Sequence, residues 1–537
     1  MADRISLLPK RNTTQGCLEL FGVGGWVGPC IAAHKLDCPS GPPQERLRQD
    51  RADVLAATVP SRPVEPRQLT SRASLEEIAE TMLSLLSETH QQSLLEGLSK
   101  QASWTLGSIC SGTDVCSMAA SALLLAVRKL ADKKTQVPDF LHVFSCEINK
   151  AKQDFLRQFV GPRLVFEDAA AMGSQKAHGV ISNTLQYIPA VDCMIAGFVC
   201  KDVSHMNRHA CSSKSCISEA SKRTGRTFQA VLQYCERHRP GVVILENVTA
   251  IEDIDPESMQ SNAEVCCSLL QGLGYQVFTK AMTPQLHGVP HRRNRFWFVA
   301  LLMSYDALAK EAYTFSQPMW NTFQEALDSV TLTPPMLPDF VLGADDAELR
   351  LWQQHRLEMR EKTVKAEELA ASQASQVSVE SDLPDDCEWP ELHKEMFRSN
   401  QKRYPVNLRL IYNSKQLAAL QVLSQRQREI VAFWDLTKPP PPNEEEVLDL
   451  AQGISRTPNC QGSVPCILPN SVLWLRRAFR LLEPSECLCM QALPLLPFAS
   501  LQHWSTAEIM SLAGNAFCGA NVMALLLASF VAYERQI

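Results

Sequence analysis

A thiol, a carboxyl group and two guanidinium groups stand where apolar segments of this sequence meet polar turns. The apolar segment 191–200 ends at Cys200, a later one ends near Glu246, and Arg293 and Arg295 precede a third. Such segments are typical of buried strands in an open α/β sheet, whose carboxyl ends form the ligand-binding edge. A nucleophilic thiol, a proton-sharing acid and two arginines suit attack on an electron-poor heterocycle.

Cys200 is one of nineteen cysteines, and most free cysteines in proteins are buried and unreactive. Its place at the end of a predicted strand distinguishes it. The Ser-rich stretch that follows is basic and predicts a mobile loop that closes over a phosphate backbone, with a merely solvated loop as the alternative. Its cations are Lys201, Arg208, Lys214, Lys222, Arg223 and Arg226, against the acids Asp202 and Glu219.

Three further strand ends carry groups that suit a nucleoside. A glycine-containing turn between a strand and a helix brings backbone N–H groups close to an anionic ligand. Acidic side chains at the next two strand ends suit a ribose diol and an adenine amino group, although each alone also fits a solvated carboxylate or a helix N-cap. The turn is Cys110, Ser111, Gly112, Thr113 and Asp114, and the two acids are Glu147 and Asp168.

A second glycine-containing stretch, 18–25, also resembles a strand followed by a turn. No strand with an acidic residue follows it about 20 residues later, as a dinucleotide-binding motif requires. We therefore interpret it as a loop.

Short apolar segments alternate with helical patterns from residue 105 to 302, which predicts an α/β fold with a doubly wound, mostly parallel sheet. The expected strands are 105–109, 141–146, 163–167, 191–198, 241–248, 275–282 and 295–302. Helices are expected over 74–97, 115–130, 474–493 and 519–533. We divide the chain into a poorly ordered segment (1–70), a catalytic core (71–302), an inserted region with flexible segments (303–470) and closing helices (471–537).

Composition limits the classes of protein to consider. The chain has 537 residues, 45% of them hydrophobic, and a formal charge of −6, which argues against coating nucleic acid through bulk charge. No membrane-spanning run and no signal peptide are expected, so the cysteines are interpreted as reduced thiols. No paired Cys-x-x-Cys spacing occurs, and we expect no metal site.

With these motifs in this order, the chain resembles the cytosine carbon-5 DNA methyltransferases. The matching motifs are Gly197-Phe-Val-Cys200, Glu246-Asn-Val248, His291-Arg-Arg-Asn-Arg295, Leu482–Pro494 and Gly514-Asn-Ala-Phe517. The resemblance covers about 105–302 and 474–535. It implies a Rossmann-like methyltransferase fold with a seven-strand-type sheet and an inserted, smaller target-recognition domain.

The resemblance also implies a cofactor and a mechanism. S-adenosylmethionine would be bound by the 110–114 turn, Glu147 and Asp168, with Asn515 nearby. Cys200 would add to C6 of cytosine, Glu246 would stabilise the ring protonated at N3, and Arg295 and Arg293 would hold the base. A stacked base is out of reach, so the target must be flipped out of DNA or already unpaired. A DNA substrate implies a nuclear or DNA-associated location.

Several residues depart from the family pattern. Val199 replaces the proline before the nucleophile, which we expect to loosen that turn. Lys201 replaces glutamine, and a lysine beside a thiol is expected to lower its pKa. Val203, His291 and Asp114 are further departures.

Two alternatives stay open: the same reaction on RNA, and a non-catalytic relative that only binds DNA or cofactor. Basic residues of the inserted region fit either a nucleic-acid contact or a solvated helix face. They include Lys402, Arg403, Arg409, Arg426 and Arg428.

Overall fold

The fold is described from a computed structural model for residues 66–132, 135–205, 216–217, 222–255, 258–303, 316–374, 390–405, 407–457 and 459–533. The predicted N-terminal segment and the 18–25 loop lie outside these residues, except for the last few positions of the former. Much of the predicted loop after Cys200 also lies outside them.

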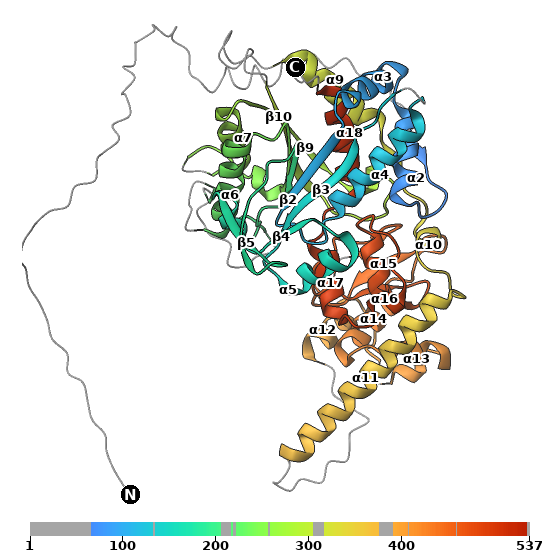
Figure 1. Cartoon of the computed structure of the whole chain (residues 1–537). Helices are drawn as coiled ribbons and strands as arrows, with labels where there is room; N and C mark the ends of the chain where they lie inside the picture. Colours follow the sequence, from blue (N-terminus) through green and yellow to red (C-terminus); the bar gives the residue numbers. More distant parts are fainter. Residues whose placement is uncertain are drawn as a thin grey trace, which may run out of the picture. The chain divides into compact units, whose positions relative to one another are not determined.

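A nine-stranded sheet forms the centre of the catalytic part, in the order β6-β5-β4-β3-β2-β7-β8-β10-β9 (Figure 1). Its five middle strands, β4-β3-β2-β7-β8, are parallel, and β10 runs antiparallel to both β8 and β9. The strands are β2 (Ser103–Ile109), β3 (Asp139–Cys146), β4 (Leu164–Phe166), β5 (Lys176–Gly179), β6 (Thr184–Tyr187), β7 (Cys193–Ala196), β8 (Val242–Val248), β9 (Tyr275–Met282) and β10 (Arg295–Leu302). All seven predicted strands are present.

The strand order reverses between β2 and β7. The chain passes from β2 outward to β3 and β4, then returns to β7 on the other side of β2 and continues to β8. Ligands of open α/β sheets bind at such a switch point, beyond the carboxyl ends of the strands. The turns that follow β2 and β7 carry the predicted cofactor and nucleophile residues.

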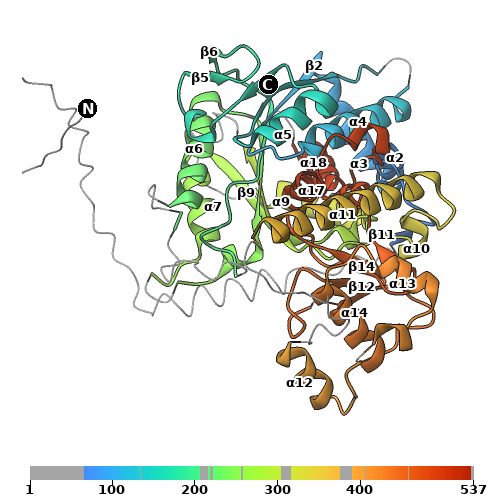
Figure 2. The same ribbon diagram turned by 90° about the horizontal axis from the view of Figure 1, so that it is seen from below.

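Helices cover both faces of the sheet, which explains the continuous apolar strands (Figures 1 and 2). In β8, Val242 and Ile244 belong to the core on one face, and Val243 and Leu245 belong to the core on the other. One face packs against α2 (Leu75–Leu85), α3 (Glu88–Ser99), α4 (Val115–Leu130), α5 (Lys150–Phe155), α9 (Gln317–Ser329) and α18 (Gly519–Ala532). The other packs against α6 (Arg223–His238) and α7 (Asn262–Gly272).

Helix α18 is buried along its whole length, from Gly519 to Ala532. The stretch Thr506–Ala532 is long and apolar enough to cross a membrane, yet 94% of its most apolar window is buried inside the protein. Its hydropathy is thus explained by a place in the core.

The region after β10 has a core of its own, built around Phe397, Leu423, Ile430 and Trp474. Its longest helix is α11 (Ala347–Ala374), followed by α12 (Glu391–Ser399), α13 (Ser414–Leu420) and α14 (Gln425–Thr437). A four-stranded sheet joins β12 (Glu446–Asp449), β13 (Asn459–Gln461), β14 (Leu473–Leu475) and β15 (Arg480–Leu481). Before α11, the short strand β11 (Leu332–Thr333) pairs in parallel with β1 (Arg67–Gln68), and α10 (Leu337–Phe340) follows it. After β15 come three short helices, α15 (Pro484–Cys489), α16 (Phe498–Leu501) and α17 (Thr506–Asn515).

Three sequence expectations need correction. The predicted helix 74–97 is two helices, because Ser74 and Ser87 each cap a separate helix. The predicted helix 474–493 is wrong in its first half, where β14 pairs with β12, and the helix starts only at Pro484. The β5–β6 hairpin was not predicted, since its residues lack a clear apolar alternation.

Candidate active site

The nucleophile candidate follows β7 on a tightly packed turn. Gly197 has no room for a side chain, because a Cβ atom there would lie 2.5 Å from the ring of Phe517. Phe198 is buried, and its carbonyl oxygen accepts a hydrogen bond from Asn247 Nδ2 at 3.1 Å. Cys200, at the end of this turn, is partly exposed. The turn therefore presents the thiol at the open edge of the sheet.

Glu246 and Arg295 form an ion pair beside this turn. Arg295 Nε lies 2.9 Å from Glu246 Oε1, and both side chains are largely buried. The other carboxylate oxygen, Oε2, lies 3.6 Å from the position of a Cβ atom at Gly197. The acid is thus held by Arg295 on one oxygen and faces the nucleophile turn with the other.

Arg293 is buried and reaches across to the C-terminal part of the chain. Its Nη1 donates to the carbonyl oxygens of Gly514 at 3.1 Å and Ile467 at 3.4 Å. Cys466 Sγ lies 3.9 Å from this nitrogen and 3.7 Å from Arg295 Nη2. A second thiol, which the sequence did not single out, therefore contacts both arginines.

The segment that carries the arginines is anchored by backbone pairing. Arg292 N–H donates to the carbonyl oxygen of Val464, and Val464 N–H donates to that of Pro290, both at 2.8 Å. His291 is buried between Met490 O (2.9 Å) and the N–H of Ile467 (3.3 Å). Burial lowers the pKa of His291 well below its ordinary value, so this departure from the family pattern is a neutral structural residue.

The pKa of Cys200 is raised from its ordinary value. Burial is the largest cause and the charge of Glu246 the second, while Arg295 and Arg293 act in the opposite direction. The lowered pKa that we expected from Lys201 is therefore wrong. At neutral pH the thiol form of Cys200 predominates.

The turn after β2 combines several left-handed backbone positions. Cys110 (φ 56°), Gly112 (φ 59°) and Asp114 (φ 49°) all have positive φ values. A Cβ atom at Gly112 would lie 3.3 Å from the backbone oxygen of Asn515, so glycine permits this close approach. Thr113 is fully buried, and its hydroxyl has no hydrogen-bond partner within the described residues.

The Asp114 side chain faces the interior beneath this turn. Its carboxylate accepts hydrogen bonds from Ser108 Oγ (2.6 Å), Ser145 Oγ (2.5 Å) and Cys116 Sγ (2.7 Å), and His142 Nε2 lies 3.1 Å away. Burial acts to raise the pKa of Asp114, but the charge and hydrogen bonds around it outweigh burial and lower that pKa. The structure thus places Asp114 as a support of the turn.

Glu147 joins the same turn from the end of β3. One carboxylate oxygen accepts from Gly112 N–H and the other from Asn149 N–H, both at 2.9 Å. Burial first and Glu147 second raise the pKa of Cys110 to about 12, with Asp168 a further contributor. Cys110, Glu147 and Asp168 follow the carboxyl ends of the neighbouring parallel strands β2, β3 and β4, so they share one edge of the sheet.

Asp168 and Asn515 have other partners in this structure. Asp168 accepts from Ala170 N–H at 2.9 Å, and Arg226 Nη2 lies 3.3 Å from its second oxygen. The Asn515 side chain is exposed and donates to the carbonyl oxygen of Ser511 at 2.7 Å. Only its backbone approaches the glycine turn.

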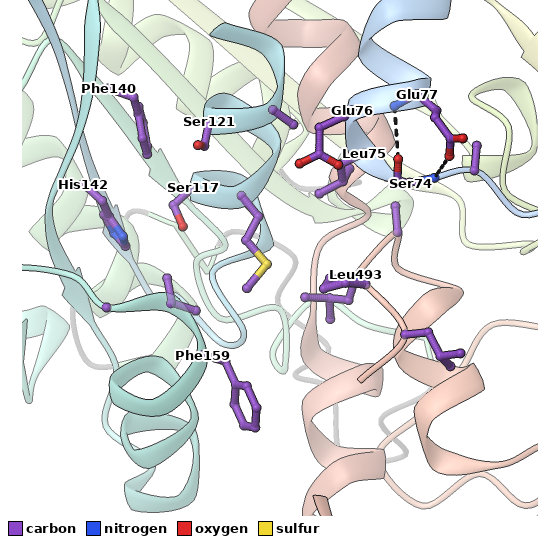
Figure 3. A pocket seen from close by; sticks show the side chains of 18 of the residues that line it. Ser74, Leu75, Glu76, Glu77, Ser117, Ser121, Phe140, His142, Phe159 and Leu493 are labelled. Carbon is purple, nitrogen blue, oxygen red and sulfur yellow. Dashed lines mark hydrogen bonds between the residues drawn. The ribbon is translucent and has the colours of Figure 1, made fainter. Parts of the chain in front are cut away.

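A separate cavity of about 760 Å³ lies beside α4, between β3, α2 and the segment 492–495 (Figure 3). His142, Ser117, Phe140 and Phe159 line it, and none of the four catalytic candidates does. His142 also contacts the Asp114 network. The cavity thus borders the support of the cofactor turn and lies apart from the thiol.

The C-5 cytosine-specific DNA methylase family model matches residues 128–519, and the chain belongs to this family. The match begins within α4, so the 110–114 turn lies upstream of it. DNA (cytosine-5-)-methyltransferase DMT5 of Verticillium dahliae is 24% identical over 506 residues, covering 81% of this chain and 20% of that protein.

Two further relatives match shorter stretches. DMT5 of Cryptococcus neoformans var. grubii is 32% identical over 143 residues, which cover 27% of this chain and 6% of that protein. The type II methyltransferase M.MspI of a Moraxella species is 27% identical over 115 residues, covering 21% of this chain and 25% of that enzyme. The chain spans a quarter or less of the length of these three relatives.

Proposed function

We propose that this chain transfers a methyl group from S-adenosylmethionine to carbon 5 of cytosine in DNA, with Cys200 as nucleophile. One observation carries the proposal: a partly exposed thiol, a carboxylate and two guanidinium groups lie together at the ends of β7 and β8 and the start of β10, beside the switch point of the sheet. Family membership supports cytosine in DNA as the substrate. A nuclear or DNA-associated location accompanies this substrate.

The residues around the 110–114 turn fit the proposed cofactor. The carboxylate of Glu147 lies at the tip of β3 and suits a ribose diol, while Asp168 follows β4, and its carboxylate is of the kind that accepts from an adenine amino group. Ile148, directly after Glu147, is 72% exposed and offers an apolar surface to a purine. The buried hydroxyl of Thr113, which has no hydrogen-bond partner among the residues that the structure describes, would supply a further polar group. When bound, S-adenosylmethionine supplies an electrophilic methyl group.

The chain's own residues then prepare the base. The partly exposed Cys200 thiol gives its proton to water, and its sulfur bonds to C6 of cytosine, which moves electron density toward C5. Glu246 Oε2 shares a proton with ring nitrogen N3, while Arg295 keeps the carboxyl group in place. After C5 has gained the methyl group, water takes the C5 proton, and the electron pair of that C–H bond forms the C5–C6 double bond again. The sulfur leaves C6 as a thiolate, and N3 gives up the proton that it shared with Glu246.

A covalent trap tests the proposal. In duplex DNA containing 5-fluorocytosine, fluorine replaces the C5 hydrogen and cannot leave as a proton. The bond between sulfur and C6 therefore persists. We expect the full chain with S-adenosylmethionine to form an adduct that survives denaturation, whereas Cys200→Ser forms none. No adduct in the parent chain would contradict the proposal, and an adduct only with the matching RNA would move the substrate to RNA.

A further inference from the structure

We propose that Thr227 is a positioning residue for the Cys200 turn, holding by a hydrogen bond the backbone of the residue before the nucleophile. The inference rests on the proposed function only for its catalytic consequence. The residues on either side of Cys200 are hydrogen-bonded to the start of α6, Val199 to Thr227 and Asp202 to Thr224, and we call this pair of contacts the clamp.

The first contact fixes Val199. Its N–H donates to Thr227 Oγ1 at 3.1 Å. The Thr227 hydroxyl in turn donates within its helix, to the carbonyl oxygens of Thr224 (3.0 Å) or Arg223 (3.1 Å). Because the hydroxyl proton is used inside the helix, an oxygen lone pair is left for the N–H of Val199.

The second contact fixes the other side of the nucleophile. Thr224 N–H donates to Asp202 Oδ2 at 2.7 Å, so Asp202 satisfies a free donor at the start of α6. Asp202 N–H donates back to Thr224 Oγ1 at 3.3 Å. The carbonyl oxygen of Cys200 accepts from Ser204 N–H at 3.0 Å, which closes the turn.

These contacts explain how valine serves at position 199. A proline there would fix φ through its ring and would carry no N–H. Valine leaves φ free, which led us to expect a loosened turn, but its N–H is held by Thr227. The hydrogen bond from Val199 to Thr227 thus restrains the backbone that a proline ring would otherwise restrain. The orientation of the Cys200 thiol toward Glu246 and Arg295 depends on this hydrogen bond.

Alkylation of Cys200 by iodoacetamide, followed by peptide mass spectrometry on the full chain, tests the clamp. Thr227→Val removes the acceptor and keeps the shape, so Cys200 should react about three- to ten-fold faster, the size expected for one hydrogen bond. Thr227→Ser retains the hydroxyl and should restore the parent rate. Cys267, a partly exposed thiol of α7, is the internal reference.

A matched control separates the clamp from general loosening. Thr322 lies in α9 and its hydroxyl likewise donates to a helix carbonyl, that of Pro318 at 3.0 Å. Thr322→Val should leave the alkylation of Cys200 unchanged. Equal acceleration by both valine variants would overturn the proposal.

A double substitution gives the sharper test. Val199→Pro has no N–H for Thr227 to accept, so adding Thr227→Val to it should change the alkylation rate of Cys200 no further. An additional effect as large as in the parent background would contradict the clamp. If circular dichroism shows that Val199→Pro is unfolded, the Thr227→Ser variant provides the test. Alkylation of Cys200 in Thr227→Ser as fast as in Thr227→Val would overturn the proposal.

The rate of covalent adduct formation is a second readout, and it separates this inference from the proposed function. Thr227→Val should slow adduct formation on 5-fluorocytosine DNA about three- to ten-fold at saturating DNA, with the DNA concentration at half-maximal rate unchanged. A parent chain that forms no adduct contradicts the methyltransferase proposal, while its alkylation pattern still decides the clamp.

Discussion

The two sides of the switch point are held together by different forces. On the nucleophile side, ionised groups from distant parts of the chain meet, with Arg295 paired to Glu246 and Arg293 bound to Gly514. On the cofactor side, hydroxyl and thiol groups surround the buried carboxylate of Asp114. We infer that substitutions on the nucleophile side lower the rate of methyl transfer, whereas those on the cofactor side change the affinity for the cofactor and the stability of the fold.

The largest expected effect is on the nucleophile side. Cys200→Ser should lower methylation by at least about 10⁴-fold, the scale at which enzymes lose activity with their nucleophile, and leave DNA binding intact. Methyl transfer to duplex DNA and a gel-shift titration measure the two quantities. Cys267→Ser serves as control and should behave like the parent. Methylation that persists in Cys200→Ser would point instead to Cys466, the other thiol beside the arginines.

Glu246→Gln should lower turnover by about 10²- to 10⁴-fold, since it removes the proposed proton partner of the base. It should also shift the alkylation of Cys200 to lower pH. Burial, the main cause of the raised thiol pKa, persists, but the second cause, the charge of Glu246, is gone. Alkylation rates measured across the alkaline range test this, and a shift to higher pH would contradict the described geometry.

Glu147→Gln tests the cofactor side. One of its two backbone donors, Gly112 N–H or Asn149 N–H, would then face an amide NH₂ group. We expect the S-adenosylmethionine concentration at half-maximal rate to rise about ten-fold, with little change in DNA affinity. Glu167→Gln, which alters a surface acid paired with His178 at 3.5 Å, is the control. Equal effects of both variants would argue against a cofactor role for Glu147.

The smallest effect is expected from Asp114→Asn, which should lower the midpoint of thermal unfolding by roughly 2 to 4 °C at neutral pH. The folded-state pKa of Asp114 is lowered, so its stabilisation is fully present above the ordinary carboxyl pKa of about 4 and is lost as pH falls below it. The gap between parent and variant should therefore narrow in acid. Thermal melts at both pH values measure it, with the exposed Asp139→Asn as control; a gap that widens in acid would refute this assignment.

The sequence was sufficient for seven of the nine strands of the main sheet, because those seven have continuous apolar segments, whereas β5 and β6 are partly exposed and were missed. It also predicted that Cys200, Glu246 and Arg295 lie at one edge of the sheet, since each stands at a strand end, while their catalytic roles stay a prediction. Cys466 was missed because it lies in a loop far along the chain, and only tertiary pairing brings it to the arginines. Thr227 was missed for a similar reason: its hydroxyl looks like any helix threonine until Val199 is placed beside it.

The pairing of Pro290 and Arg292 with Val464 also determines when the site can form during synthesis of the chain. A ribosome delivers the thiol and the acid long before residue 464 exists, and synthesis runs from the N-terminus. Until that late loop arrives, the guanidinium groups lack the backbone partners that seat them. A nascent chain that has not yet reached residue 467 would thus lack these contacts, and its Arg293 would not be held by Ile467.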